Sequence, residues 1–169
     1  MTKRVLVAYA TKHGATRGIA DRIAEELREA GLDASVAEVR EVAGLESFDA
    51  VVLGSAVYAG RWRGEAVRFV KRHRAELASR PLWLFSNGPL DTETVPATLE
   101  MTKPVARITA GLAPVDHETF GGALLPGTPG FIEGLMLRSR AGDFRDWDHV
   151  RAWTREIAAD LGAGSAVPA

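Results

Sequence analysis

Short apolar segments alternate with segments of helical periodicity along this chain, and that alternation most constrains its fold. The first apolar segment, residues 4–9, precedes a helix predicted over about residues 16–30, in which Ile19, Ile23 and Leu27 share one stripe. The segment 50–55 is apolar on both of its faces, as is typical of a strand covered by helices on both sides of a sheet. The pattern therefore predicts an α/β fold with parallel strands joined by right-handed crossovers.

The remaining elements follow from the same pattern and from helix and turn signals. Further strands are predicted over about 33–39, 81–86 and 118–124, and further helices over about 64–78, 95–110, 131–138 and from 146 onwards. Pro104 is expected to interrupt the helical region 95–110, and Asp146 to cap the last helix. We expect a single domain over residues 1–162 with a five-stranded parallel sheet, followed by a flexible tail at 163–169.

Composition excludes several classes of protein. Hydrophobic residues make up 46% and charged residues 25% of the 169 residues, which indicates a globular, soluble chain. There is no cysteine, so disulfides and thiolate metal sites are excluded, and a cytoplasmic location is favoured. A net charge of −1 argues against nucleic acid as a partner. The four histidines show no metal-ligand spacing, so no metal is predicted.

Three loops follow neighbouring strands of the predicted sheet, and in an open α/β sheet ligands bind at this carboxyl edge. We expect these loops to form a binding site for a cofactor with a phosphate end and a flat ring. The candidate residues are Thr11, Lys12, His13, Gly14, Ala15 and Thr16 in the first loop, Ala56, Val57, Tyr58, Ala59 and Gly60 in the second, and Asn87, Gly88, Pro89 and Leu90 in the third.

The first loop has the features of a phosphate site. Its backbone N–H groups, two threonine hydroxyls and the positive end of a helix converge on one point. Thr11 and Thr16 are the candidate phosphate contacts; the alternatives are a turn hydrogen bond for Thr11 and helix capping for Thr16. Lys12 and His13 either add positive charge near the phosphate or point into water.

Aromatic residues in the second loop are the candidates for contact with the ring. Tyr58 is preferred over Trp62, for which packing at the start of a helix is the alternative. Trp83, Trp147 and Trp153 are expected in the core. Asn87 and Gly88 would lie near the ring through their backbone groups.

Other phosphate-binding and hydrolytic classes lack their signatures here. The positions where a receiver domain would carry its acidic residues hold Ala10-Thr11 and Gly54-Ser55. The nucleotide-binding loops G-x-x-x-x-G-K-S/T and G-x-G-x-x-G are absent, and so is the G-x-S-x-G nucleophile elbow. No side chain stands out as a general acid or base, so no catalytic residue is assigned.

The segment 9–17, Tyr-Ala-Thr-Lys-His-Gly-Ala-Thr-Arg, resembles the loop with which flavodoxin-fold proteins bind the phosphate of FMN. With segments 52–60, 69–73, 121–124 and 146–157, the chain is most similar to the bacterial menaquinone-dependent protoporphyrinogen oxidase group of that fold. The resemblance implies a three-layer sandwich, a strand order of 2-1-3-4-5 and FMN as the cofactor.

The same resemblance implies a function. The implied protein is an FMN-dependent oxidoreductase that oxidises a porphyrinogen-like substrate with a quinone as electron acceptor. Its implied location is the cytoplasm, at most peripheral to the inner face of the membrane. Two departures bear on the porphyrin substrate more than on FMN: region 125–142 is shorter than in that group and broken by prolines and glycines, and His13 replaces an acidic residue. Apolar residues within 131–137 could form a homodimer face or a weak membrane contact.

A flavodoxin-like electron carrier, which serves a redox protein partner and has no small-molecule substrate of its own, is the alternative. Such carriers are usually strongly acidic because opposite charge steers docking to basic reductases. The net charge of −1 argues against this alternative. So do the cations expected near the ring edge, which are Arg61, Arg63, Lys71, Arg72 and Arg74.

Overall fold

The structure is a computed structural model that describes residues 2–12, 14–88, 101–121, 123–124, 142–143 and 145–163. Its centre is a parallel sheet of β1 (Arg4–Ala10), β2 (Asp33–Glu38), β3 (Ala50–Tyr58), β5 (Leu82–Gly88) and β6 (Asp116–Gly121). The order is β2-β1-β3-β5-β6, which confirms the predicted order because β5 and β6 are the fourth and fifth parallel strands.

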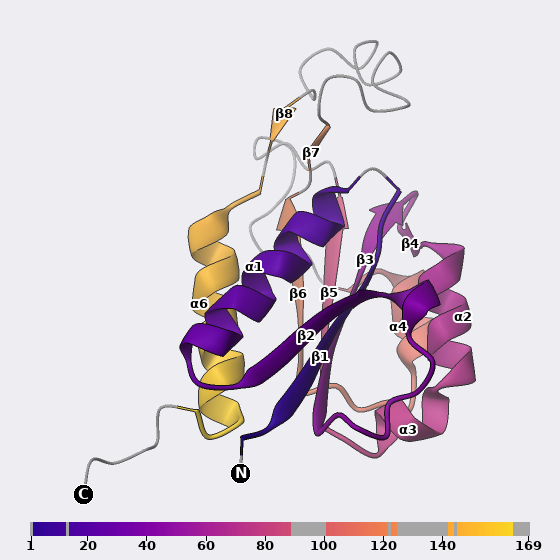
Figure 1. The fold of residues 1–169 in the computed structure, drawn as a ribbon. Helices are drawn as coiled ribbons and strands as arrows, with labels where there is room; N and C mark the ends of the chain where they lie inside the picture. The colour runs from indigo at the N-terminus through magenta and orange to yellow at the C-terminus, as the bar shows by residue number, and fades with distance from the viewer. Residues whose placement is uncertain are drawn as a thin grey trace, which may run out of the picture.

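Helices cover both faces of this sheet, as the apolar strands require (Figure 1). The helices α1 (Ala15–Glu29) and α6 (Trp147–Asp160) lie on one face. The helices α2 (Gly64–Arg72), α3 (Arg74–Ala78) and α4 (Lys103–Thr109) lie on the other. A single 3₁₀ turn, η1 (Val39–Glu41), follows β2. The three-layer architecture is therefore confirmed.

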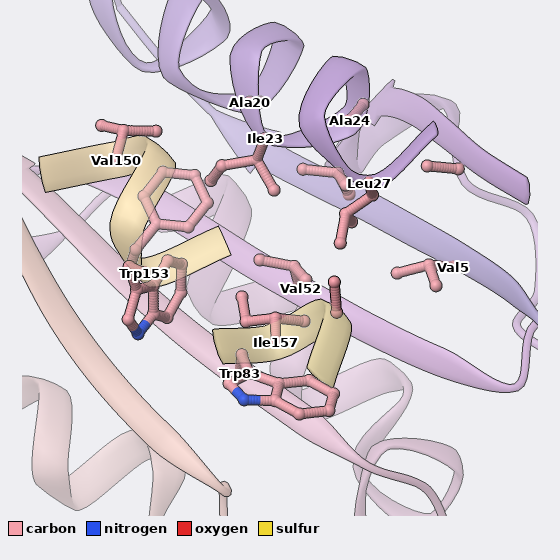
Figure 2. Packing of buried hydrophobic residues seen from close by; sticks show 14 of the residues in the cluster. Val5, Ala20, Ile23, Ala24, Leu27, Val52, Trp83, Val150, Trp153 and Ile157 are labelled. Carbon is pink, nitrogen blue, oxygen red and sulfur yellow. The ribbon is translucent and has the colours of Figure 1, made fainter. Parts of the chain in front are cut away.

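The alternation of side chains along β1 divides the core into two clusters. Val5 and Val7 pack with α1 and α6, whereas Leu6 and Ala8 pack with α2 and α4 on the opposite face. Figure 2 shows the first cluster, in which Ile23 and Leu27 of α1 meet Trp153 and Ile157 of α6 above Val52 and Trp83. Trp83 and Trp153 are buried as predicted, and Trp147 is partly buried against the same cluster.

The prediction of one continuous helix over residues 64–78 is wrong. It breaks at His73, which separates α2 from α3 with φ −105° and ψ 21°. The His73 ring is buried against Phe69, and its Nδ1 lies 2.9 Å from the Glu76 carboxylate. The local histidine–glutamate contact therefore ends one helix and starts the next, although the apolar periodicity continues through it.

Two predicted boundaries near the end of the sheet are also corrected. The fifth parallel strand begins two residues earlier than expected and ends at Gly121. Residues 123–124 form the separate strand β7 (Ala123–Leu124), which pairs antiparallel with β8 (Gly142–Asp143) instead of continuing the parallel sheet. Pro104 lies in the first turn of α4, where its missing N–H has no helical partner to lose, so a helix starts at this proline, as expected for a break in the region 95–110.

Several predicted features lie outside the described residues. These are residues 95–100 of the predicted helical region 95–110, the segments 125–141 and 164–169, and with them the predicted helix 131–138 and most of the tail. Within the described part of the chain, no helix is both long and apolar enough to cross a membrane. The same residues hold no group of three or more His, Cys, Asp or Glu side chains arranged for a metal ion.

Candidate cofactor site at the carboxyl edge of the sheet

The register of the parallel strands brings three strand ends to one edge of the sheet. Ala10 at the end of β1 pairs with Ser55 of β3, and Ala56 of β3 pairs with Asn87 of β5. The candidate loops that follow β1, β3 and β5 therefore begin side by side, as the sequence predicts.

The N-terminus of α1 opens at this edge. Gly14 precedes the helix with φ 90°, a left-handed conformation that favours glycine, and the first bond of the helix runs from the Gly18 N–H to the Gly14 carbonyl. The amides of Ala15, Thr16 and Arg17 consequently have no acceptor inside the helix. No side chain of the described residues caps them, and the first turn contains no acidic residue.

The start of α6 shows what a closed helix terminus looks like in the same molecule. There the Asp146 carboxylate accepts a hydrogen bond from the His149 N–H at 3.1 Å, and Asp148 adds a second negative charge to the first turn. The predicted cap at Asp146 is confirmed. The comparison indicates that α1 keeps its positive end available for an anion.

Thr11 makes the turn hydrogen bond that the sequence offers as its alternative role. Its Oγ1 accepts from the Gly14 N–H at 2.9 Å, which holds the loop in place before α1. Lys12 is exposed, and its Nζ lies 6.0 Å from the centre of the Tyr58 ring. The first and second loops therefore face each other across the edge of the sheet. His13 lies outside the described residues.

Thr16 is fully buried and faces the sheet. Its hydroxyl donates a hydrogen bond to Oδ1 of Asn87 at 2.6 Å, and Asn87 is itself buried at the end of β5. The capping alternative for Thr16 is wrong, because Gly14 occupies the cap position and Thr16 is the second residue of the helix. The bond joins α1 to the third candidate loop, while the Thr16 amide remains at the open helix terminus.

The second loop is a tight hairpin that sequence reasoning missed. Ala56, Val57 and Tyr58 belong to β3, and β4 (Arg61–Trp62) turns back to pair with β3 antiparallel. Ala59 and Gly60 connect the two strands with φ 49° and 75°, the pattern of a type I′ turn. The usual Asn-Gly signal of that turn is absent, so a turn beginning with alanine was not recognised.

The hairpin presents Tyr58 at the site. Its side chain is 44% exposed, and partial burial raises the pKa of its hydroxyl above the usual 10.0, although Arg63 acts in the opposite direction. Tyr58 therefore offers a neutral aromatic ring at physiological pH. Thr102 holds the turn from the other side, because its hydroxyl donates to the Gly60 carbonyl at 2.5 Å.

Trp62 packs inside the protein and does not face the ring site. It lies in β4 and not at a helix start, and its Nε1 donates to Ser86 Oγ at 2.8 Å. Ser86 Oγ in turn lies 3.1 Å from Nε2 of His117 on β6. Burial lowers the pKa of His117 below 6.5, against the opposing influence of Glu118 and Asp116. Neither Ser86 nor His117 was a sequence candidate, because their link spans two strands.

The third loop begins inside the sheet. Asn87 and Gly88 are the last residues of β5 and both are buried, whereas Pro89 and Leu90 lie outside the described residues. Beside them, Ser55 Oγ accepts from the Arg63 N–H at 3.0 Å, and the Arg63 guanidinium binds Glu65 at 3.0 Å. Buried Arg63 Nε has no partner within the part of the chain that the structure describes.

This geometry fits a cofactor with a phosphate at one end. An open helix terminus, a loop ordered by Thr11 and an exposed lysine surround the place for an anion, and a neutral tyrosine stands opposite. The structure thus brings together the first loop, Tyr58 and Asn87. It removes Trp62 from the set of candidates.

Comparison with known proteins identifies relatives of the whole fold. The sequence model of the family described as "Flavodoxin domain" matches residues 6–139. Protoporphyrinogen IX dehydrogenase [quinone] of Escherichia coli (strain K12) is 28% identical over 172 aligned positions, covering 92% of this chain and 94% of that protein.

Solved structures agree on the fold. Oxidised flavodoxin 2 of Bacillus cereus superposes with a TM-score of 0.61 at 20% identity, covering 93% of this chain and 99% of that one. Rubredoxin oxygen:oxidoreductase of Desulfovibrio gigas gives a TM-score of 0.62 at 16% identity. This chain is covered to 98% in that match but spans only 38% of the larger protein, so the similarity concerns one part of it.

Proposed function

The chain belongs to the flavodoxin domain family, and from this premise we propose that it is an FMN-dependent oxidoreductase which oxidises a porphyrinogen-like substrate and passes the electrons to a quinone. FMN is the cofactor of this family, so the cofactor predicted from the first loop is confirmed at the level of the family. Our proposal concerns three further points: which residues hold FMN, which substrate is oxidised, and which acceptor receives the electrons.

The phosphate of FMN would lie at the start of α1. The amides of Ala15 and Thr16 would donate to it, Gly14 lets the backbone come close, and Lys12 would add positive charge. In the structure the Thr11 Oγ1 accepts from the Gly14 N–H, so we propose that the hydroxyl orders the loop through this bond and donates its own hydrogen to a phosphate oxygen.

The ring of FMN would lie between the second and third loops. Tyr58 would contact its face, the backbone of Ala59 and Gly60 would lie at its edge, and Asn87 and Gly88 would border it from β5. When bound, FMN supplies one- and two-electron redox chemistry. The contribution of the protein is to hold the ring in position and to set the polarity around it, with Asn87 fixed by Thr16.

The observation that carries the proposal is the open N-terminus of α1 facing Tyr58 across the edge of the sheet. The reaction is supported by the similarity to the protoporphyrinogen IX dehydrogenase of Escherichia coli, which covers both chains almost fully. That relative carries "quinone" in its name, and this supports a quinone as the acceptor.

Titration of the apoprotein with FMN and with riboflavin tests the phosphate site. Riboflavin has the same ring but no phosphate, so we expect it to bind at least about tenfold more weakly, a loss of about 1.4 kcal/mol or more. Quenching of flavin fluorescence gives both dissociation constants. Equal affinities would contradict a phosphate site at α1 and leave only the ring contacts.

Anaerobic turnover tests the reaction. FMN-loaded protein is mixed with protoporphyrinogen IX and menadione, and the appearance of porphyrin fluorescence is followed. We expect a rate that depends on both the loaded protein and the quinone. A rate equal to the one without protein, from a preparation shown by absorbance to carry FMN, would reject the substrate and leave FMN binding intact.

An electron carrier is the second candidate, and the size of the fold favours it. Flavodoxin 2 of Bacillus cereus is matched over 99% of its length, so the described fold has no large addition relative to a flavodoxin. A carrier would be reduced rapidly by a flavodoxin reductase, with a rate that falls steeply as salt is added. Slow reduction that is insensitive to salt, together with porphyrinogen turnover, would favour the enzyme.

A further inference from the structure

A groove of about 410 Å³ lies beside the candidate cofactor site, on the face of the sheet that α2 and α4 cover. It is bounded by β4, α2 and α4, which lie together on the right of Figure 1. The residues that line it are Arg61, Trp62, Gly64, Val67, Arg68, Lys71, Pro104 and Ile108. None of them belongs to the three cofactor loops.

The floor of the groove is apolar. Trp62, which is 4% exposed, contributes to its lining, and the indole N–H is already bonded to Ser86, so the side chain offers no free donor to the groove. Val67 of α2 and Ile108 of α4 are partly buried against the same core cluster. A ligand in the groove would therefore remove apolar surface of both partners from water, which favours binding.

The rim of the groove is cationic. Arg68 and Lys71 are three residues apart on α2, so they share one side of the helix, and Arg61 joins them from β4. All three side chains are exposed. No acidic residue is found among the described residues that line the groove.

These three cations differ from the other basic residues nearby. Arg63 binds Glu65, and Arg74 donates to the carbonyls of Ala110 and Ile108 at the end of α4. The side chains of Arg61, Arg68 and Lys71 make no hydrogen bond or ion pair with any residue that the structure describes, although Glu65 lies close enough to interact with Arg68 at longer range. Three like charges around one hollow are stabilised when an anion lies between them.

We propose that this groove binds a small amphipathic carboxylate, with the apolar body of the ligand on Trp62, Val67 and Ile108 and its carboxylate between Arg61, Arg68 and Lys71. The volume lies within the range of small-molecule sites, about 300–1,000 Å³. The cations surround a concave space between two helices, which favours a small molecule over the flat surface of a membrane. The site is separate from the proposed reaction and does not depend on it.

Calorimetric titration of FMN-loaded protein with dodecanoate tests the site. Dodecyltrimethylammonium has the same chain with a positive head, and acetate has the carboxylate without the chain. We expect dodecanoate to bind and both comparison compounds to bind at least about tenfold more weakly. If both dodecyl compounds bound equally well, the cationic rim would not select a carboxylate. If acetate bound as well as dodecanoate, the apolar floor would not contribute to binding.

Charge reversal locates the site. The double variant Arg68→Glu, Lys71→Glu should bind dodecanoate at least about tenfold more weakly. The variant Arg155→Glu, at an exposed position of α6 on the other face of the sheet, should bind it like the parent protein. Circular dichroism and retained FMN show that each variant is folded. Unchanged binding in the double variant would overturn the proposal.

A membrane is the competing partner, and sedimentation with phosphatidylglycerol vesicles distinguishes it. Our proposal predicts that the parent protein and the double variant sediment to the same low extent. Strong vesicle binding that the double variant loses, in a protein that does not take up monomeric dodecanoate, would assign the cationic rim to a lipid surface and refute the groove as a small-molecule site.

Discussion

The hydrogen bond between Thr16 and Asn87 joins the first and third loops of the candidate site. Both side chains are buried, and their positions are 71 residues apart in sequence. An amide buried beside a cofactor must have its polar atoms satisfied, and Thr16 supplies the donor for Oδ1. The threonine thereby fixes the orientation of Asn87.

Replacing Thr16 tests this role. Thr16→Val keeps the shape of the side chain but leaves Oδ1 of Asn87 without its donor, so we expect the free energy of unfolding to fall by about 1–3 kcal/mol. Urea denaturation of the apoprotein measures the change. Thr16→Ser keeps the hydroxyl and is the matched control; if serine lost as much stability as valine, the hydrogen bond would not be the cause.

His117 makes the stability of the protein depend on pH. Burial lowers the pKa of its imidazole below 6.5, so the unfolded chain takes up a proton at a higher pH than the folded protein does. The contribution of His117 to stability is therefore complete above pH 6.5 and is lost as the pH falls through the lowered pKa.

The variant His117→Gln isolates this effect. Glutamine does not titrate and can still bond to Ser86, so we expect its stability to decline less than that of the parent protein between about pH 7.5 and about pH 5. Denaturation at the two pH values gives the difference. A parallel decline in both proteins would show that His117 is not the source of the acid sensitivity.

At the residue scale, sequence reasoning predicted which residues meet at the candidate site but not the direction of every side chain. Thr11, Gly14 and Tyr58 could be found because a strand, a turn and a helix follow one another locally. The inward direction of Thr16 could not, because its partner lies on another strand. Trp62 takes the packing role that the sequence offers as its alternative, but its partner Ser86 lies on another strand and could not be predicted.

At the scale of elements, the N-termini of α1 and α6 differ in whether a side chain caps their free amides. The start of α6 is closed by Asp146, whereas the start of α1 is closed by no side chain of the described residues and lies at the edge where the strands end. Capping residues are recognisable in sequence, and Asp146 was predicted correctly. An uncapped terminus is recognisable only once the structure shows what its amides face.

Asp146→Ala should remove the cap of α6. We expect the free energy of unfolding to fall by about 1 kcal/mol, within the range of about 0.5–2 kcal/mol seen for lost helix caps. FMN affinity should change little, because the Asp146 carboxylate bonds within α6, to the His149 N–H. Asp146→Asn retains an acceptor and should recover most of the stability; a loss of FMN binding in the alanine variant would show that α6 contributes to the site.

The hairpin of β3 and β4 and the break at His73 show where element prediction fails. Both depend on local geometry that hydrophobic periodicity does not report: two residues with positive φ in the first, and a histidine–glutamate contact in the second. Long amphipathic helices and apolar strands were predicted well because their periodicity is repeated over many residues.

At the scale of the whole molecule, the strand order followed from the family resemblance, and the parallel sheet followed from the alternation of elements. The groove on the α2 face could not be predicted, because α4 and β4 contribute to it from positions more than forty residues apart. Sequence placed the cations of α2 correctly at the surface but did not show that three of them surround one hollow.

Cofactor loading should stabilise the entire fold. A ligand that binds only the folded protein adds about 2.7 kcal/mol at a free concentration of about one hundred times its dissociation constant. We therefore expect the Tm to rise as FMN is added, with a smaller rise for riboflavin at the same concentration. Differential scanning calorimetry measures both, and a Tm that does not respond to FMN would contradict binding to the native state.

The uncapped start of α1 has a consequence for the life of the protein in a cell. Without its ligand, the first turn of that helix should open to proteases more readily than it does with the ligand bound. Newly made protein that meets no flavin would be degraded sooner than protein that does. The amount of this protein would then follow the vitamin supply of the organism without any dedicated regulator.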